Sequence, residues 1–446
     1  MTLAAPDTAA TPSFAEATKL WAKVGVLSFG GAAGQIAMMH RFVVDERRWV
    51  EERRFLDALN YCTLLPGPEA QQLATYLGWL MHGARGGLVA GLLFVIPGAV
   101  FMLGLCLLYA LGTGVPLIDG IFFGIKAAVL AIVAEAVIRI GRRAMKTWLL
   151  VALSIAAFLA ILLLNAPFPL VILAAGAVGI VLATRQPDLL SLKGVGGEPT
   201  TRSLAERARE AATSALVWLA VWWAPVALAA LLLGGGHILV ELGLFFSKLA
   251  VITFGGAYAV LAYLADEAVN AKHWVSAAEM IDGLGLAETT PGPTILVNQF
   301  VGFLAAMRAP GPLAPLAAAT LGAIMTVWVT FAPSFLWIFA GAPFLDDLRR
   351  SPRIAGALAA ITAAVVGVVA HLALWFALNV LFRTVRQADV GPLHLIFVEP
   401  ATIRPDALVL SALAVALIFV LHRGVVFTVA VLAAAGAALT LLGLRA

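Results

Sequence analysis

The sequence predicts an all-α, polytopic membrane protein of two inverted-topology repeats with re-entrant helical hairpins. Three observations predict it: an apolar composition, an internal duplication and a reversal of loop charge between the copies. Of the 446 residues, 62% are hydrophobic and 12% are charged, whereas soluble domains carry roughly 25% charged residues. At about 20 residues per helical crossing, the chain has room for on the order of ten crossings. A large soluble catalytic domain is therefore excluded.

The second observation is the duplication. Shifting the sequence by 225 positions aligns residues 23–68 with residues 248–293 without a gap, and 15 of these 46 positions are identical. The identities include a Lys, a Phe-Gly-Gly-Ala run and a Pro-Gly-Pro run in each copy. We expect a cytosolic tail over 1–15, a first repeat over 16–184, a cytosolic linker over 185–211, a linking transmembrane helix over 212–235 and an inverted second repeat over 236–446.

The third observation is the charge of the matching loops. Residues 41–54 carry five Arg, whereas the matching residues 266–279 carry one permanent cation, Lys272. Further on, the first copy is basic at 139–146, while the second has its Arg residues at a different turn, 349–353. Basic loops stay in the cytoplasm, so the copies should cross the membrane in opposite directions. The N-terminus is then cytosolic and the C-terminus external.

Each Phe-Gly-Gly and each Pro-Gly-Pro segment is predicted to be a hairpin that enters the membrane and returns. Residues 55–65 and 69–81 are each long enough for about half a crossing, roughly 15 to 20 Å at 1.5 Å per residue. Matching hairpins are expected at 241–265 and 276–306, and full crossings at these motifs are the alternative. Nine full crossings are expected, near 88–111, 116–138, 148–164, 168–184, 212–233, 312–340, 354–382, 405–421 and 424–444.

The hairpin tips are the candidate anion-binding site. A tip exposes backbone N–H groups and a positive helix end. Glycine lets a ligand approach the backbone, and proline fits the first turn of a helix. Plain turns are the alternative explanation. The candidate binding residues are Lys23, Gly30, Gly31, Pro66, Gly67, Pro68, Gln71, Gln72, Lys248, Gly255, Gly256, Thr289, Thr290, Pro291, Gly292 and Pro293. Glu69 and Glu288 are candidates for carrying a coupled proton, with helix capping as their alternative role.

The remaining charged residues in apolar sequence are open to two explanations. Lys23 and Lys248 stand six residues before their Phe-Gly-Gly motifs, where they either supply positive charge or extend to the membrane surface. Lys126 lies too far from Glu135 for a helix-face pair, so it either faces a cavity or partners another helix. The Arg residues of 41–54 alternate with acids, which is typical of a solvated loop.

Other classes of site are weakly supported. The two cysteines lie in apolar sequence and the seven His show no ligand spacing, so we expect no metal and no cofactor. No basic domain suited to nucleic acid is present. No GxxxxGK[ST] run is present either, so an ion gradient or an exchange reaction would drive transport.

Several ordered motifs together resemble a known family. The runs 29–40, 45–49, 59–62 and 64–74, with the second-copy motifs between 253 and 293, look like the chromate ion transporter family in its long, two-domain form. Many members have Pro after Phe-Gly-Gly, where this chain has Ala32 and Ala257.

The resemblance implies a function. It implies a secondary transporter of the bacterial inner (cytoplasmic) membrane that exports chromate and confers chromate resistance, and not an enzyme. A carrier of sulfate or another tetrahedral oxyanion and an integral-membrane enzyme are the alternatives. The expected partners are chromate, with sulfate as the second candidate, the lipid bilayer and, as one option, a second copy in a homodimer.

Overall fold

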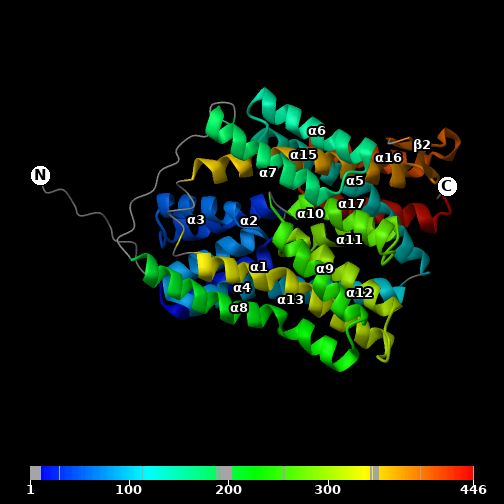
Figure 1. The fold of residues 1–446 in the computed structure, drawn as a ribbon. Coiled ribbons are helices and arrows are strands. Elements are labelled where there is room, and N and C mark those ends of the chain that lie inside the picture. The colour runs from blue at the N-terminus through cyan, green and yellow to red at the C-terminus, as the bar shows by residue number, and fades with distance from the viewer. Residues whose placement is uncertain are drawn as a thin grey trace, which may run out of the picture.

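The protein folds into a bundle of helices that lie side by side (Figure 1). The computed structural model describes residues 12–29, 31–112, 114–186, 190, 203–254, 257–341, 344, 351–391 and 393–444. The first half contains α1 (Phe14–Leu27), α2 (Gly31–His40), η1 (Arg41–Glu46), α3 (Glu52–Leu64), α4 (Glu69–Gly112), α5 (Pro116–Ala144), α6 (Trp148–Leu164) and α7 (Phe168–Arg185).

The second half repeats this order after a linking helix, α8 (Leu204–Leu233). It contains α9 (Ile238–Ile252), α10 (Ala257–Asp266), η3 (Glu267–Ala271), α11 (Ala277–Thr289), η4 (Thr294–Leu296), α12 (Val297–Arg308), α13 (Pro315–Gly341), α15 (Pro352–Leu381), α16 (Pro405–Val415), η7 (Ala416–Val420) and α17 (Val425–Leu441). In Figure 1, α3 lies towards one end of the bundle, and the C-terminal helix and the β-hairpin described below lie at the other.

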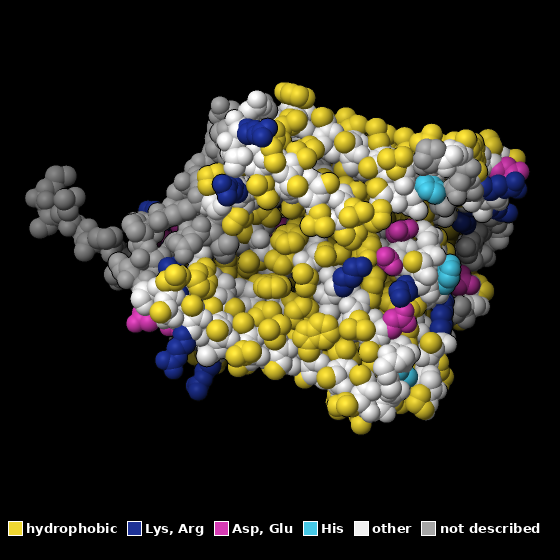
Figure 2. Space-filling view, in the orientation of Figure 1, with side chains coloured by type: hydrophobic (Ala, Val, Ile, Leu, Met, Phe, Trp, Pro, Cys, Tyr) yellow, Lys and Arg dark blue, Asp and Glu magenta, His cyan; other side chains and the backbone are white. Residues whose placement is uncertain are grey.

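The surface of the bundle is that of a membrane protein. Six of the described helices are long and apolar enough to cross a bilayer: α4, α5, α7, α8, α13 and α15. Large apolar side chains are exposed on them, such as Leu173 at 68% and Leu231 at 83%. Figure 2 shows a broad apolar band across the visible face, with most charged side chains towards the two ends. The predicted all-α, polytopic membrane fold is confirmed, and three of the nine expected crossings are shorter apolar helices: α6, α16 with η7, and α17.

Helix α4 is two helices joined by a sharp turn. Non-helical dihedral angles at His82 and Gly83 divide it. Gly78 and Gly86 then lie so close together that a Cβ on either would collide with the other's backbone, which places 69–81 and 84–112 side by side. In the second half, Gly302 of α12 and Gly322 of α13 approach each other in the same way. Close helix approach at small residues is typical of membrane helix packing.

A two-stranded sheet departs from the purely helical prediction. Strands β1 (Val385–Val390) and β2 (Leu393–Val398) pair antiparallel, with Val385 opposite Val398 and Val390 opposite Leu393. Gly391 has φ of +63° at the connecting turn, a conformation that glycine adopts without strain. Strand β2 is rich in large apolar and β-branched residues, and β1 begins and ends with Val. This stretch connects the expected crossings 354–382 and 405–421, and no strand was predicted in it.

Several predicted boundaries are corrected or lie outside the described residues. Helix α8 begins at Leu204, within the expected linker 185–211, because Ser203 caps it by accepting a hydrogen bond from the Glu206 amide at 3.3 Å. Helix α5 continues to Ala144, beyond the expected end at 138. The tail residues 1–11, most of the linker and the Arg349–Arg350 pair lie outside the described residues.

The two halves interlock. Gly120 of α5 lies against Gly436 of α17, and Gly356 of α15 lies against Gly179 of α7. The turns of the two halves also exchange hydrogen bonds. The Gly67 amide donates to the Thr253 carbonyl at 2.9 Å, and the Gly292 amide donates to the Ser28 carbonyl at 2.7 Å. Since Gly67 and Ser28 correspond to Gly292 and Thr253 at the 225-residue offset, each Pro-Gly-Pro turn is held by the other copy.

Candidate functional site

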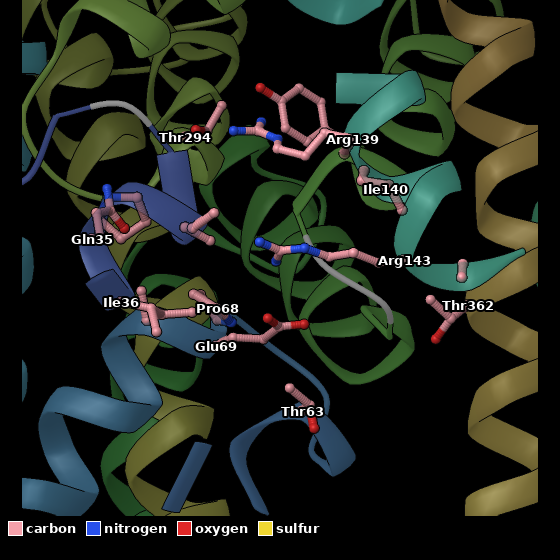
Figure 3. Close-up of a pocket in the computed structure, with 16 residues that line it drawn as sticks. Gln35, Ile36, Thr63, Pro68, Glu69, Arg139, Ile140, Arg143, Thr294 and Thr362 are labelled. Carbon is pink, nitrogen blue, oxygen red and sulfur yellow. The ribbon is translucent and has the colours of Figure 1, made fainter. Parts of the chain in front are cut away.

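A cavity of about 320 Å³, with charged and polar groups set in a mainly apolar lining, lies where the turns of the two halves meet. It is lined by the beginning of α2, the end of α3, the Pro-Gly-Pro turns and the last part of α5. Figure 3 shows charged and polar side chains from these elements arranged around the open space. The polar lining residues are Gln35, Thr63, Glu69, Arg139, Arg143, Tyr258, Thr294 and Thr362.

Equivalent positions of the two copies face this cavity. Pro68 and Glu69 of the first copy line it together with Pro293 and Thr294, their counterparts at the 225-residue offset. Ala33 and its counterpart Tyr258 do the same. The cavity therefore lies where the copies meet, which is where transporters built from repeats hold their substrates.

Two arginines supply its positive charge. Arg139 and Arg143 stand four residues apart on α5, so they share one face of the helix. Glu135, one turn earlier on α5, forms an ion pair with Arg139, with 3.5 Å between Arg139 Nη2 and Glu135 Oε2. This leaves guanidinium donors available to a ligand. Arginine binds tetrahedral oxyanions well because its planar donors can engage two oxygens at once.

Hydroxyl and carboxyl groups complete the lining. The Tyr258 hydroxyl donates to Glu288 Oε1 at 2.7 Å, and both side chains are buried. Figure 3 shows the Glu69 carboxylate and the Arg143 guanidinium pointing towards one another across the cavity. An ionised Glu69 would compete with a bound anion for Arg143, whereas a protonated Glu69 could donate a hydrogen bond to it.

Gln35 connects the cavity to the second turn. Its side chain is fully buried, and Nε2 donates to the carbonyls of Ser28 at 3.1 Å and Gly292 at 2.6 Å. Gln35 thereby holds the first Phe-Gly-Gly turn against the second Pro-Gly-Pro turn. Its Oε1 atom has no hydrogen-bond partner in the described structure.

Comparison with known proteins identifies the family. A sequence profile described as "Chromate transporter" matches residues 15–180 and 240–440. The "Chromate transport protein" of Pseudomonas aeruginosa is 32% identical over 356 residues, which is 78% of this chain and 77% of that protein. The chain belongs to the chromate transporter family.

Other relatives agree. The "Chromate transport protein" of Cupriavidus metallidurans is 26% identical over 81% of this chain and 82% of its own length. An uncharacterized transporter of Methanocaldococcus jannaschii is 25% identical over 80% of this chain and 83% of its own length. No solved structure matches the chain.

Three of the residues predicted from the sequence line the cavity. Pro68 and Pro293 were predicted to bind the anion, and Glu69 was predicted to carry a coupled proton. Gly31 lies at its edge, because a Cβ on Gly31 would be 4.0 Å from Arg139 Nη2 and from Thr294 Oγ1. Gly31 also has φ of +72°, a conformation that side chains with a Cβ rarely adopt.

Other predicted residues support the turns and do not line the cavity. Gln72 Nε2 donates to the Pro66 carbonyl at 2.7 Å. The hydroxyls of Thr289 and Thr290 both bond to the Leu286 carbonyl within their own helix, at 2.8 and 2.7 Å. Gln71 is fully buried, and neither of its side-chain polar atoms has a partner among the described residues. The remaining turn residues, Gly67, Pro291 and Gly292, shape the contacts between the copies.

The two duplicated lysines lie away from the cavity. Lys23 is exposed on α1, with its ammonium 4.7 Å from the centre of the Phe42 ring. Lys248 is exposed on α9 and donates to the Tyr263 hydroxyl at 2.8 Å. The predicted residues Gly30, Gly255 and Gly256 lie outside the described residues.

Lys126 partners another helix, one of the two roles open to it. Its ammonium lies 3.1 Å from Asp282 Oδ2 on α11, and the Tyr109 hydroxyl donates to the same oxygen at 3.1 Å. Asp282 is 3% exposed. This cluster ties α4, α5 and α11 together inside the bundle.

Sequence analysis missed Arg139, Arg143 and Tyr258. The arginines were assigned to a cytosolic loop because the crossing was ended at 138. The spacing of Glu135, Arg139 and Arg143 at i, i+4 and i+8 was the available signal that they continue one helical face. Tyr258 had no such signal, since it differs from its counterpart Ala33. Within the described part of the chain, no three His, Cys, Asp or Glu side chains come close enough to hold a metal ion.

Proposed function

We propose that this member of the chromate transporter family exports chromate from the cytoplasm across the bacterial inner membrane and thereby confers chromate resistance. The observation that carries the proposal is the cavity in which Arg139 and Arg143 face polar groups from both copies. Its function is to carry the anion and not to transform it.

The cavity suits a hydrated tetrahedral dianion. Its volume of about 320 Å³ corresponds to roughly ten water molecules at about 30 Å³ each. The guanidinium groups of Arg139 and Arg143 can donate to the oxygens of the dianion, and a protonated Glu69 can donate to a further one. These same features fit sulfate, which remains the second candidate substrate.

The proposed orientation places the two halves in opposite directions, with the N-terminus cytosolic and the C-terminus external. The five Arg residues of 41–54 and the single permanent cation of the matching residues 266–279 support it. Single cysteines in 41–54 and in 266–273 should react with an impermeant thiol reagent from opposite sides of the membrane. Labelling of both from the same side would overturn the orientation.

Export of a dianion needs little other energy at modest gradients. A negative-inside potential favours outward movement by roughly 2.3 kcal/mol per charge per 100 mV. Purified protein in liposomes should therefore move labelled chromate in response to an imposed potential. Parallel measurements with labelled sulfate separate the two substrates, and no protein-dependent flux of either anion would overturn the proposal.

Glu69 is the proposed link to protons. Because its carboxylate points at Arg143 (Figure 3), the neutral variant Glu69→Gln should bind chromate more tightly at neutral pH and should lose much of the pH dependence of transport. Glu288→Gln tests the second candidate, whose carboxylate is held by Tyr258. Unchanged pH profiles in both variants would remove the two residues from coupling.

A further inference from the structure

A second polar cavity, of about 260 Å³, lies towards the β-hairpin end of the bundle. It is lined by the ends of α6, α10 and α15 together with β2. Its polar lining includes Asn165, Asp266, Asn270, His273, His371 and His394.

This cavity is built from the repeat counterparts of helices that line the first one. Shifting the sequence by 236 positions aligns the 29 residues of α5 with residues 352–380, and nine of these positions are identical. Glu135 and Arg139 then correspond to His371 and Trp375. Helices α2 and α5 line the first cavity, and α10 and α15 line the second. Tyr258 of α10 and Thr362 of α15 also line the first cavity, so the second cavity adjoins the same two helices without being the repeat counterpart of the first.

The same two helices connect the cavities. On α10, Tyr258 lines the first and Ala262 the second, which are one turn or about 6 Å apart. On α15, Thr362 lines the first and His371 the second, roughly 13 Å apart. Helices α10 and α15 pack against each other. The two cavities are therefore neighbours along the same pair of packed helices.

The cavities differ in charge. Arg139 and Arg143 line the first, whereas the described residues that line the second include no Lys or Arg. The second contains Asp266, whose Oδ1 accepts from Asn270 Nδ2 at 2.9 Å. His273 contacts the Val269 carbonyl through Nδ1 at 2.9 Å. An anion in the second cavity meets neutral donors and one carboxylate, so it is held more weakly.

We infer that the second cavity is the exit half of the anion path, a weak-binding vestibule from which the oxyanion is released on the far side of the membrane. This inference rests on the proposed function. Tight binding in the first cavity allows capture of a dilute anion, and weak binding in the second allows it to leave. The direction of net flux is set by the electrochemical gradient, since unequal affinities at two sites provide no driving force.

Blocking the second cavity is the first test. In Ala262→Trp, the indole would fill much of the vestibule without touching Arg139 or Arg143. We expect loss of chromate flux in liposomes, while chromate binding to the purified protein stays at the level of the parent chain. Leu173→Trp, on the exposed surface of α7, is the control for a bulky substitution and should transport normally. Flux through Ala262→Trp equal to that of the control overturns the inference.

A cysteine variant tests the same point without a bulky side chain. Leu162 of α6 lines the vestibule, whereas Leu159, one turn earlier, is 42% exposed on the apolar surface. The native Cys62 and Cys106 are both fully buried, so the parent chain is the unlabelled control. An impermeant anionic thiol reagent should modify Leu162→Cys from the β-hairpin side, stop transport, and react more slowly in saturating chromate. Leu159→Cys should not react.

The outcomes separate this inference from the proposed function. If the parent chain moves neither chromate nor sulfate, the proposed function fails. If the parent transports but fully modified Leu162→Cys transports equally well, only the exit path is overturned.

Discussion

Removing one positive charge from the first cavity should weaken anion binding by a predictable amount. In Arg139→Gln, the side chain keeps hydrogen-bonding capacity and loses its charge. Two unit charges 4 Å apart interact by about 1 kcal/mol in water and about 4 kcal/mol near a protein surface. Arg139 is 30% exposed and already paired with Glu135, so a charge-assisted hydrogen bond of about 1.5–3 kcal/mol is the appropriate scale. This corresponds to roughly 10- to 150-fold weaker binding.

The matched control is on the same helical turn. Arg142 lies between Arg139 and Arg143 in sequence and does not line the first cavity, so Arg142→Gln removes the same charge from a neighbouring surface. The affinities of both variants and of the parent chain are measured by binding of labelled chromate to purified protein at fixed ionic strength. If Arg142→Gln and Arg139→Gln lose the same amount of chromate affinity, the anion is attracted by the overall positive charge at the end of α5 and not by a site in the cavity. Parent-level binding in Arg139→Gln would refute the site.

Three further predictions concern the thermal stability of the protein and the ionisation of His40, directly before the charged residues 41–54. Lys126→Met and Asp282→Asn should each lower the melting temperature in detergent, at a cost near the lower end of about 3–5 kcal/mol, and removing both charges together should cost less than the two single losses combined. Gly67→Ala should cost about 1–3 kcal/mol, because Gly67 has φ of +121° and its new Cβ would lie 2.8 Å from a buried amide nitrogen; wild-type thermal stability would contradict this. His40, directly before the charged segment 41–54, donates a hydrogen bond from Nε2 to Glu52 Oε2 at 2.5 Å, and this bond raises the pKa of His40. Its stabilising effect should therefore be complete below the ordinary value near 6.5 and disappear as the pH rises through the raised value. Hydrogen exchange in η1 should show this pH dependence in the parent chain and lose it in Glu52→Gln.

Much of the fold could be predicted from the sequence because membrane helices have a strong compositional signal. The expected crossings at 116–138, 168–184 and 312–340 correspond to α5, α7 and α13, since long apolar runs have few other stable structures in a bilayer. The breaks at the Pro-Gly-Pro turns and near His82 were also placed correctly. The exact ends were not, because caps such as Ser203 and the polar continuation of α5 depend on single side chains.

The site was harder to predict than the fold. The alignment of the two copies pointed to Pro68 and Pro293, which line the cavity. It also pointed to Lys23 and Lys248, which lie outside the cavity. Both lysines are matched between the copies without facing the cavity. A repeat comparison reports positions with a shared structural role, and whether such a position faces a cavity depends on tertiary packing that local patterns do not contain.

The charged groups of the cavities occur where the two copies differ. Arg139 corresponds to Trp375, Arg143 to Asn379 and Glu69 to Thr294. The identical residues, such as the prolines and glycines of the turns, give both copies the same backbone and let them hold one another. Had both copies kept an arginine at the position of Arg139, the second cavity would also bind the anion tightly and release would be slow. In this chain the proposed binding arginines stand at positions where the copies differ, and for that reason a search for identities between the copies leaves them out.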